Sequence, residues 1–263
     1  MHMEINNREY IEDAMKRFRL VDMREHLDEL ISDAERLKMS YEEFLTSLIK
    51  CEDCGKTYRR QERLKHDAHF ESCKELEDID YSFNPSLDYS LIESLGRLDF
   101  LRRNENIVII GPPGVGKSMI ATGIGRKACM AGYKVLFVSA QDLIDKMVDV
   151  ATDGYLKEYL AELDKVELLI IDELSYLRMD KEKESLFFQI IRQRYEKSSL
   201  IITTNLPMGR WDELFTGQLA ATAILDRLVH HCTVMSITGD SYRVKGNVKQ
   251  KEEKNEQRIK NTP

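Results

Sequence analysis

The stretch Ile107–Ser118, IVIIGPPGVGKS, decides the fold of this chain. It begins with four apolar residues, a pattern typical of a strand that is buried on both faces. It ends with Gly111–Ser118, which matches G-x-x-x-x-G-K-[ST] at every specified position. The glycines let main-chain N–H groups turn toward phosphate oxygens, and the helix N-terminus that follows favours negative charge. The sequence therefore predicts a phosphate-binding loop rather than a glycine-rich turn without a ligand, since a chance match has odds of about 1 in 100.

The predicted loop is expected to hold ATP. The residues that would contact the nucleotide form one continuous segment: Gly111, Pro112, Pro113, Gly114, Val115, Gly116, Lys117, Ser118 and Met119. Lys117 is expected to reach the β- and γ-phosphates, and the Ser118 hydroxyl is expected to bind Mg²⁺.

Polar residues that follow two later apolar runs complete the candidate site. LLIIDE at 168–173 delivers Asp172 and Glu173 to the carboxyl end of a strand, where open α/β sheets bind ligands. Asp172 is predicted to hold Mg²⁺ and Glu173 to orient or deprotonate the attacking water, although an acid at this place can also simply cap the next helix. Asn205, at the end of LIITTN, can hydrogen-bond the γ-phosphate or the water; the alternative is a turn asparagine.

Short apolar runs recur along the second part of the chain, with helical stretches between them. The runs lie at 107–110, 135–138, 168–171, 200–204 and 233–237. Continuous rather than alternating hydrophobicity predicts strands covered on both faces, and intervening helices imply right-handed crossovers. We therefore expect an α/β domain with a mostly parallel sheet.

The first part of the chain has a different pattern. Apolar residues recur at three- and four-residue steps over 8–49, which predicts helices, and Ser40 with Glu43 has the spacing of a capping box. The pattern breaks around Asn84-Pro85, a turn or linker signal. We predict a helical domain at 1–77, a linker at 78–90, the nucleotide-binding domain at 91–245 and a basic, disordered tail at 246–263.

A basic segment within the helical part is a candidate DNA contact. Lys56, Arg59, Arg60 and Arg63 stand at i, i+3, i+4 and i+7, so a helix would carry them as one stripe. Such a stripe can follow a DNA backbone without reading bases. The alternative is a solvated helix face.

The same region contains a candidate zinc site. Cys51-x-x-Cys54 has the spacing of a zinc knuckle, and it is followed by His66, His69 and Cys73. His69 with Cys73 fits the second ligand pair better than His66 with His69, so the candidate ligands are Cys51, Cys54, His69 and Cys73. A finger would need a hairpin here; the alternative is thiols without a ligand on a helix.

Composition limits the class of protein. The chain has 263 residues, of which 42% are hydrophobic and 32% charged, so it is neither disordered throughout nor collagenous. No apolar run approaches the roughly 18 residues that a spanning helix needs, and no signal segment follows the N-terminus. A reduced, cytoplasmic protein without membrane association is expected. The net charge of −7 argues against general coating by nucleic acid, but residues 50–65 hold six basic residues against three acidic ones.

The run from Glu105 to Lys245, with GPPGVGKS, LLIIDELSYL and ATAILDRLVHHCTVMSITGDSYRVK, resembles the IstB family of transposition helper ATPases. This family belongs to the AAA+ superfamily and is related to DnaC-type helicase loaders. The N-terminal MSYEEFLTSLI and LEDIDYSFNPSL are also similar to IstB proteins, so the resemblance covers nearly the whole chain.

The resemblance implies an ATPase that forms a homo-oligomer on duplex DNA and helps the transposase of the same element. It implies that the N-terminal domain binds DNA and that Arg227 is an arginine finger for a neighbouring protomer; in isolation Arg227 would be read as a surface partner of Asp226. It also places Arg243 where a second sensor arginine could lie. The alternatives are a helicase loader, and a zinc-dependent DNA-binding module whose ATP site only stabilises folding; Glu173 and Arg227 argue against the module.

Overall fold

Two compact units make up the chain, residues 1–63 and 64–263. The computed structural model describes residues 7–177, 179–216 and 218–242. Arg243 and the tail at 246–263 therefore lie outside the described residues. None of the helices within the described ranges combines the length and the apolar character needed to cross a membrane.

Between residues 7 and 63, the first unit is built from helices. It contains α1 (Asn7–Arg17), α2 (Val21–Glu25), α3 (Leu27–Leu37) and the greater part of α4 (Tyr41–Asp67). The predicted capping box opens α4: Ser40 N–H donates to Glu43 at 2.7 Å, and Glu43 N–H donates to Ser40 Oγ at 3.3 Å. Helix α2 packs on α4 where Gly55 leaves room, since a Cβ there would lie 2.0 Å from the Asp22 carboxyl group.

The second unit contains a five-stranded parallel sheet in the order β2-β3-β4-β1-β5. The strands are β1 (Asn106–Ile110), β2 (Val135–Ser139), β3 (Leu168–Asp172), β4 (Ser199–Thr204) and β5 (Cys232–Ser236). All five predicted strands are confirmed, each within one residue at either end. Strand β4 lies between β1 and β3, so the ends of these three strands are neighbours.

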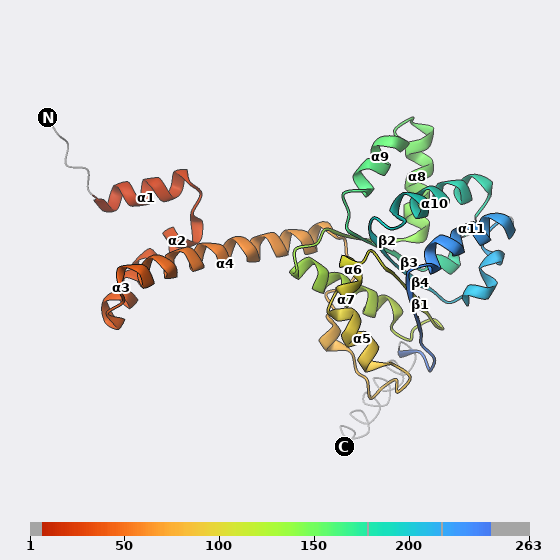
Figure 1. Cartoon of the computed structure of the whole chain (residues 1–263), viewed down its shortest axis with the longest axis horizontal. Coiled ribbons are helices and arrows are strands. Elements are labelled where there is room, and N and C mark those ends of the chain that lie inside the picture. Colours follow the sequence, from red (N-terminus) through yellow and green to blue (C-terminus); the bar gives the residue numbers. More distant parts are fainter. Residues whose placement is uncertain (1–6, 178, 217, 243–263) are drawn as a thin grey trace, which may run out of the picture. The chain divides into compact units, whose positions relative to one another are not determined.

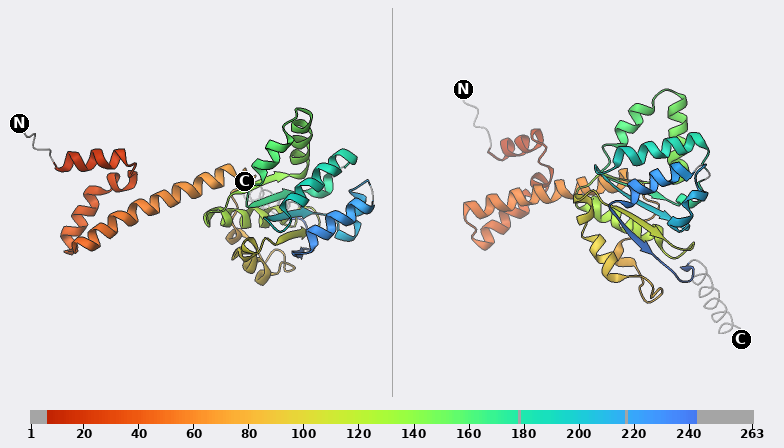
Figure 2. Two further views of the ribbon diagram at one scale, coloured as in Figure 1. Left: turned by 45° about the horizontal axis from the view of Figure 1, so that its top comes forward. Right: turned by 45° about the vertical axis from the view of Figure 1, so that its right-hand side comes forward.

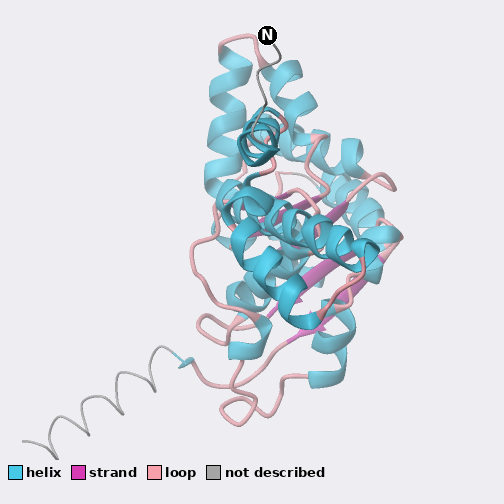
Figure 3. Cartoon of the chain, turned by 90° about the vertical axis from the view of Figure 1, so that its left-hand side faces the viewer, coloured by secondary structure: helices cyan, strands magenta, loops and turns pink. Residues whose placement is uncertain are grey.

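Helices cover both faces of the sheet, which explains the continuous apolar runs within the strands (Figures 1 and 3). One face packs against α8 (Ala140–Thr152), α9 (Leu156–Leu163), α10 (Lys181–Arg194) and α11 (Gln218–Val229). The other packs against α5 (Tyr89–Gly96), α6 (Asp99–Arg102) and α7 (Lys117–Met130). Alternate residues of a strand enter the two cores: Ile170 lies on the α7 side and Ile171 on the α8 side.

The division between the units lies earlier than the linker predicted at 78–90. Residues after Arg63 pack on the sheet domain: the Ala68 carbonyl accepts a hydrogen bond from Phe137 N–H at 2.8 Å, and Leu76 and Ile79 are buried in the α7-side core. The turn at Asn84 exists, but Asn84 is itself buried and its amide donates to the Thr238 carbonyl at 2.9 Å. A turn packed on a domain has the same local sequence signal as a linker, which is why the boundary was misplaced.

Three short 3₁₀ helices complete the described elements: η1 (Leu76–Asp78), η2 (Leu174–Tyr176) and η3 (Met208–Glu213). The first two lie beside the candidate site, because η1 precedes a segment that lines it and η2 follows the acidic pair at the end of β3. Figure 2 shows this sheet domain from two further directions.

Candidate nucleotide-binding site

The predicted phosphate-binding loop joins β1 to α7. Gly114 and Gly116 have φ values of 82° and 103°, in the left-handed region that residues with a side chain rarely adopt. Gly116 is the residue before α7, so the open N–H groups of this 14-residue helix face the loop. The Lys117 ammonium donates to the carbonyls of Gly111 and Pro112 at 2.8 and 2.9 Å. The loop is thus curled around a positive charge, as anion binding requires.

Asp172 is the centre of a short hydrogen-bond network at the end of β3. Its side chain is buried at 3% exposure, and its Oδ1 accepts hydrogen bonds from Ser118 Oγ at 3.0 Å and from Thr203 Oγ1. Glu173 N–H in turn donates to Thr203 Oγ1 at 2.9 Å. The structure therefore brings the two predicted Mg²⁺ ligands, Ser118 and Asp172, together. A hydroxyl and a buried carboxylate are oxygen donors of the kind that Mg²⁺ prefers, so these residues fit the ion.

Thr203 belongs to this network although the sequence analysis did not single it out. It is fully buried near the end of β4, between the strands that carry the loop and the acids. Its hydroxyl fixes both the Asp172 carboxylate and the main chain of Glu173. The signal was present in the sequence, since LIITTN places polar threonines within an otherwise apolar run.

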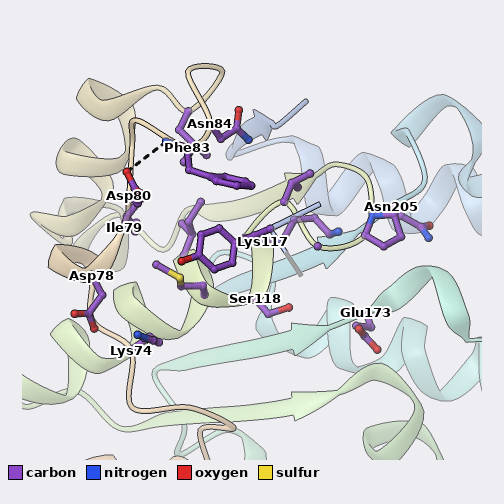
Figure 4. A pocket seen from close by; sticks show the side chains of 18 of the residues that line it. Lys74, Asp78, Ile79, Asp80, Phe83, Asn84, Lys117, Ser118, Glu173 and Asn205 are labelled. Carbon is purple, nitrogen blue, oxygen red and sulfur yellow. Dashed lines mark hydrogen bonds between the residues drawn. The ribbon is translucent and has the colours of Figure 1, made fainter. Parts of the chain in front are cut away.

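Glu173 and Asn205 lie at the pocket, as predicted. Glu173 is exposed and has φ 58°, a left-handed conformation that ends β3, and the next residue, Leu174, is fully buried at the start of η2. Asn205 follows β4, and its N–H donates to Ser175 Oγ at 3.2 Å. Both side chains line the same pocket as Lys117 and Ser118 (Figure 4).

The pocket has a volume of about 270 Å³ and extends well beyond the loop. Its further wall comes from Lys74 and from the segment predicted as a linker at 78–90, through Asp78, Ile79, Asp80, Phe83, Asn84 and Leu87 (Figure 4). These residues were missed because they are far in sequence from the loop. The only sequence signal is that DIDYSF holds apolar side chains at alternate positions, which a solvated linker does not need.

The last described residues close the same wall. Tyr242 lines the pocket, its N–H donates to the Gly114 carbonyl at 2.8 Å, and its ring packs against that of Phe83 with centroids 4.6 Å apart. The Thr238 carbonyl accepts hydrogen bonds from the side chains of Asn84 and Ser86. Residues 83–86 and 238–242 thus meet beside the phosphate-binding loop.

Arg227 does not line this pocket. It lies on α11, half-buried, with its guanidinium donating to the Ala223 carbonyl at 2.9 Å and lying 5.0 Å from the centre of the Phe188 ring. Contact with Phe188 holds the guanidinium on the surface of the α10–α11 layer. The geometry therefore argues against a role for Arg227 in the pocket of its own chain.

The basic stripe lies on one helix, α4, as predicted, but part of it is already paired. Arg59 contacts Asp22 at 2.6 Å and Glu52 at 3.7 Å, and Lys56 contacts Glu52 at 3.4 Å. The Glu52 carboxylate is buried and also accepts from the N–H groups of Asp22 and Met23 at the start of α2. Arg59 and Lys56 thus balance the buried Glu52 and the partly buried Asp22 within the first unit, and all four basic residues of the stripe are exposed.

The predicted zinc ligands are not brought together. Cys51 and Cys54 lie on α4, which continues without a break to Asp67, so the hairpin of a finger is absent from this segment. Helix geometry alone separates Cys54 from His66 by about 18 Å. His69 follows in a turn with φ 58°, and Cys73 is exposed. The zinc interpretation is therefore corrected: the C-x-x-C spacing here places two cysteines three residues apart on one continuous helix.

The geometry defines the class of protein. A phosphate-binding loop after β1, an acidic pair after β3 and a polar residue after the intervening strand β4 are the features of a P-loop nucleotide-binding domain of the AAA+ type.

Comparison with known proteins identifies the family. The family described as IstB-like ATP binding protein matches residues 13–250, and the chain belongs to this family. The insertion sequence IS21 putative ATP-binding protein of Pseudomonas aeruginosa is 37% identical over 235 residues, 89% of each chain. The insertion sequence IS5376 putative ATP-binding protein of Geobacillus stearothermophilus is 35% identical over 95% of this chain and 100% of that protein.

Solved structures show the same fold. AMPPCP-bound DnaA from Aquifex aeolicus superimposes with a TM-score of 0.55, with 21% identity over 71% of this chain and 56% of that chain. DnaI superimposes with a TM-score of 0.53, with 20% identity over 63% of this chain and 92% of that chain. At this level of identity the likeness concerns the fold of the sheet domain.

Proposed function

We propose that this protein hydrolyses ATP and acts in the cytoplasm as a DNA-binding helper of insertion-sequence transposition, forming oligomers on duplex DNA and stimulating the transposase of the same element. The role in transposition is supported by the family, because the chain belongs to a family of ATP-binding proteins and its relatives are insertion-sequence proteins. The observation that carries the enzymatic part is the arrangement of Ser118, Asp172 and Glu173 beside Lys117. A protein that only bound ATP would not need Glu173 at the pocket.

Each residue of the site has a chemical task in this proposal. The Lys117 ammonium exchanges its two carbonyl partners for phosphate oxygens, which offer full negative charge. Ser118 and Asp172 hold Mg²⁺, which neutralises charge that develops on the β- and γ-phosphates. Glu173 accepts a proton from the attacking water, and Asn205 donates to the γ-phosphate or positions that water. The Thr203 hydroxyl holds the Asp172 carboxylate and the Glu173 main chain in place through its hydrogen bonds.

Arg227 is proposed to complete the pocket of a neighbouring protomer. Its place on α11, away from its own pocket, is compatible with a guanidinium that acts in trans. Arg227→Ala alone should lower DNA-stimulated hydrolysis by about 10³-fold or more, the range known for arginine fingers. Arg192→Ala, which removes another exposed arginine from α10, is the matched control and should keep normal turnover.

A mixing experiment tests the same point without relying on one variant. Arg227→Ala and Lys117→Ala chains should be inactive separately, but mixed oligomers should regain hydrolysis, because each pairing of the two can contain one intact pocket. Turnover is measured as phosphate release at several mixing ratios with duplex DNA present. If no ratio restores activity although the chains co-assemble, Arg227 does not act in trans.

Duplex DNA is proposed to contact the basic stripe on α4. Arg60→Glu with Arg63→Glu should weaken DNA binding and reduce the salt slope of log K by about 2, one for each phosphate contact. Lys146→Glu with Lys157→Glu, both exposed on α8 and α9, changes the net charge equally and should leave the slope unaltered. Arg59 is left intact, since its loss would unpair Asp22. An unchanged slope in the Arg60 and Arg63 variant would place the contact elsewhere.

A helicase loader is the alternative function on the same ATPase domain. The relatives at 35–37% identity are insertion-sequence proteins, whereas the likeness to DnaI at 20% concerns the fold alone. We therefore prefer the proposal of a transposition helper to that of a helicase loader. A transposase reading frame next to the coding sequence would support this choice.

A further inference from the structure

Two loops at the amino ends of the strands bring three side chains of metal-binding type together. Glu196 lies in the turn between α10 and β4, and His230 and His231 lie between α11 and β5. Glu196 Oε1 is 3.9 Å from His230 Nδ1 and 3.7 Å from His231 Nε2. One donor atom from each of the three residues lies within 4.8 Å of the other two. We call these three residues the histidine–glutamate cluster.

The backbone that carries the cluster is fixed by other parts of the domain. Glu196 has φ 58°, a conformation that costs energy for a residue with a side chain, and its carbonyl accepts from the Asn104 amide at 3.0 Å. The His231 carbonyl accepts from Asn106 N–H at 2.7 Å. Because β1 lies between β4 and β5, residues 104–106 at the start of β1 can hydrogen-bond to the loop before β4 and to the loop before β5. The three side chains thus start from positions that the fold determines.

We propose that the histidine–glutamate cluster binds one divalent transition-metal ion of the Zn²⁺, Co²⁺ and Ni²⁺ class. Two imidazole nitrogens and one carboxylate oxygen suit these ions, whereas Mg²⁺ and Ca²⁺ prefer oxygen ligands alone. Tetrahedral coordination with metal–nitrogen bonds near 2.0–2.1 Å needs donor atoms about 3.3 Å apart, so small side-chain rotations suffice. The three side chains are 49–56% exposed, which leaves an open path for the ion and for water as a further ligand.

The neighbouring Tyr195 hydroxyl lies 3.0 Å from His230 Nδ1, and this hydrogen bond orients the ring. An ion that bound through His230 Nδ1 would replace the tyrosine at this nitrogen, whereas an ion that bound through Nε2 would leave the hydrogen bond in place. The site is separate from the proposed Mg²⁺ site, because it lies at the amino ends of β4 and β5 while Ser118 and Asp172 lie at the carboxyl ends of β1 and β3. A bound ion would tie the end of α11, the helix that carries Arg227, to the turn after α10.

Cobalt binding by the full-length chain, with no added histidine tag, tests the proposal. Titration with CoCl₂, followed by calorimetry and absorbance, should give one site per chain with no thiolate-to-cobalt charge-transfer band. His231→Ala and Glu196→Gln should each weaken binding at least about tenfold. His66→Ala, which removes an exposed histidine outside the cluster, is the control and should bind cobalt as the unaltered chain does.

Thermal unfolding provides a second measurement. Co²⁺ or Zn²⁺ should raise the melting temperature of the unaltered chain and of His66→Ala, because the ion binds the folded state, and should not raise that of the two cluster variants. Equal affinity in all chains would overturn the proposal. So would a thiolate band that vanishes in Cys51→Ser with Cys54→Ser, which would place the ion on the cysteines.

Discussion

Lys117→Ala is expected to weaken ATP binding by roughly 10- to 100-fold, because each hydrogen bond to a charged group contributes about 1.5–3 kcal/mol and 1.4 kcal/mol is a factor of ten. In the structure the ammonium group is held by the Gly111 and Pro112 carbonyls at 2.8 and 2.9 Å. Phosphate oxygens would replace these neutral acceptors. Alanine has no donor to offer at this place.

The measurement is titration of the variant with a fluorescent ATP analogue in the presence of Mg²⁺. Lys146→Ala, an exposed lysine on α8, is the matched control and should bind as the unaltered chain does. Circular dichroism checks that the variant is folded, since it also loses the two hydrogen bonds within the loop. Unaltered affinity in a folded Lys117→Ala chain would show that the phosphates are not held by this loop.

Glu173→Gln is expected to lower the rate of ATP hydrolysis by about 10²- to 10⁴-fold, the contribution of a positioned general base. An amide of the same shape cannot accept the proton of the attacking water. Nucleotide affinity should stay unaltered, because Glu173 reaches the pocket without belonging to the loop. The main chain should also keep its place, since Glu173 N–H bonds to Thr203 whichever side chain follows.

Single-turnover hydrolysis and equilibrium ATP binding, measured on the same preparation, separate the two effects. Glu158→Gln on α9 removes an exposed carboxylate away from the pocket and should leave both values unaltered. If Glu173→Gln hydrolysed ATP at the normal rate, Glu173 would not be the base. If it lost ATP binding as well, its role would be in holding the nucleotide.

The sheet domain could be predicted from the sequence because its signals are local. Strands covered on both faces are apolar at every position, so a window of five residues around Ile107 or Leu168 is sufficient to find them. The loop at 111–118 could be predicted for the same reason, since its pattern is complete within eight residues. The positions of Asp172 and Asn205 near the loop could also be predicted, because the carboxyl ends of parallel strands lie at one edge of the sheet.

What could not be predicted depends on residues far apart in sequence. Arg59 has the same local pattern as a DNA-binding arginine, but its partner Asp22 lies on another helix. The C-x-x-C spacing at Cys51 is shared by zinc knuckles and by helices, and only the continuation of α4 decides between them. Thr203 and Phe83 contact the site through tertiary packing that no local window contains.

The meeting of residues 74–87 with Tyr242 beside the pocket has a practical consequence for any shortened version of this protein. A fragment trimmed to the sheet, from about residue 91 to Ile237, would lose the wall formed by Ile79 and Phe83 and the bond from Tyr242 to Gly114. Its strands would be intact, yet the part of the pocket wall that these residues form would be missing. A fragment that keeps the whole pocket has to begin at or before Lys74 and include Tyr242.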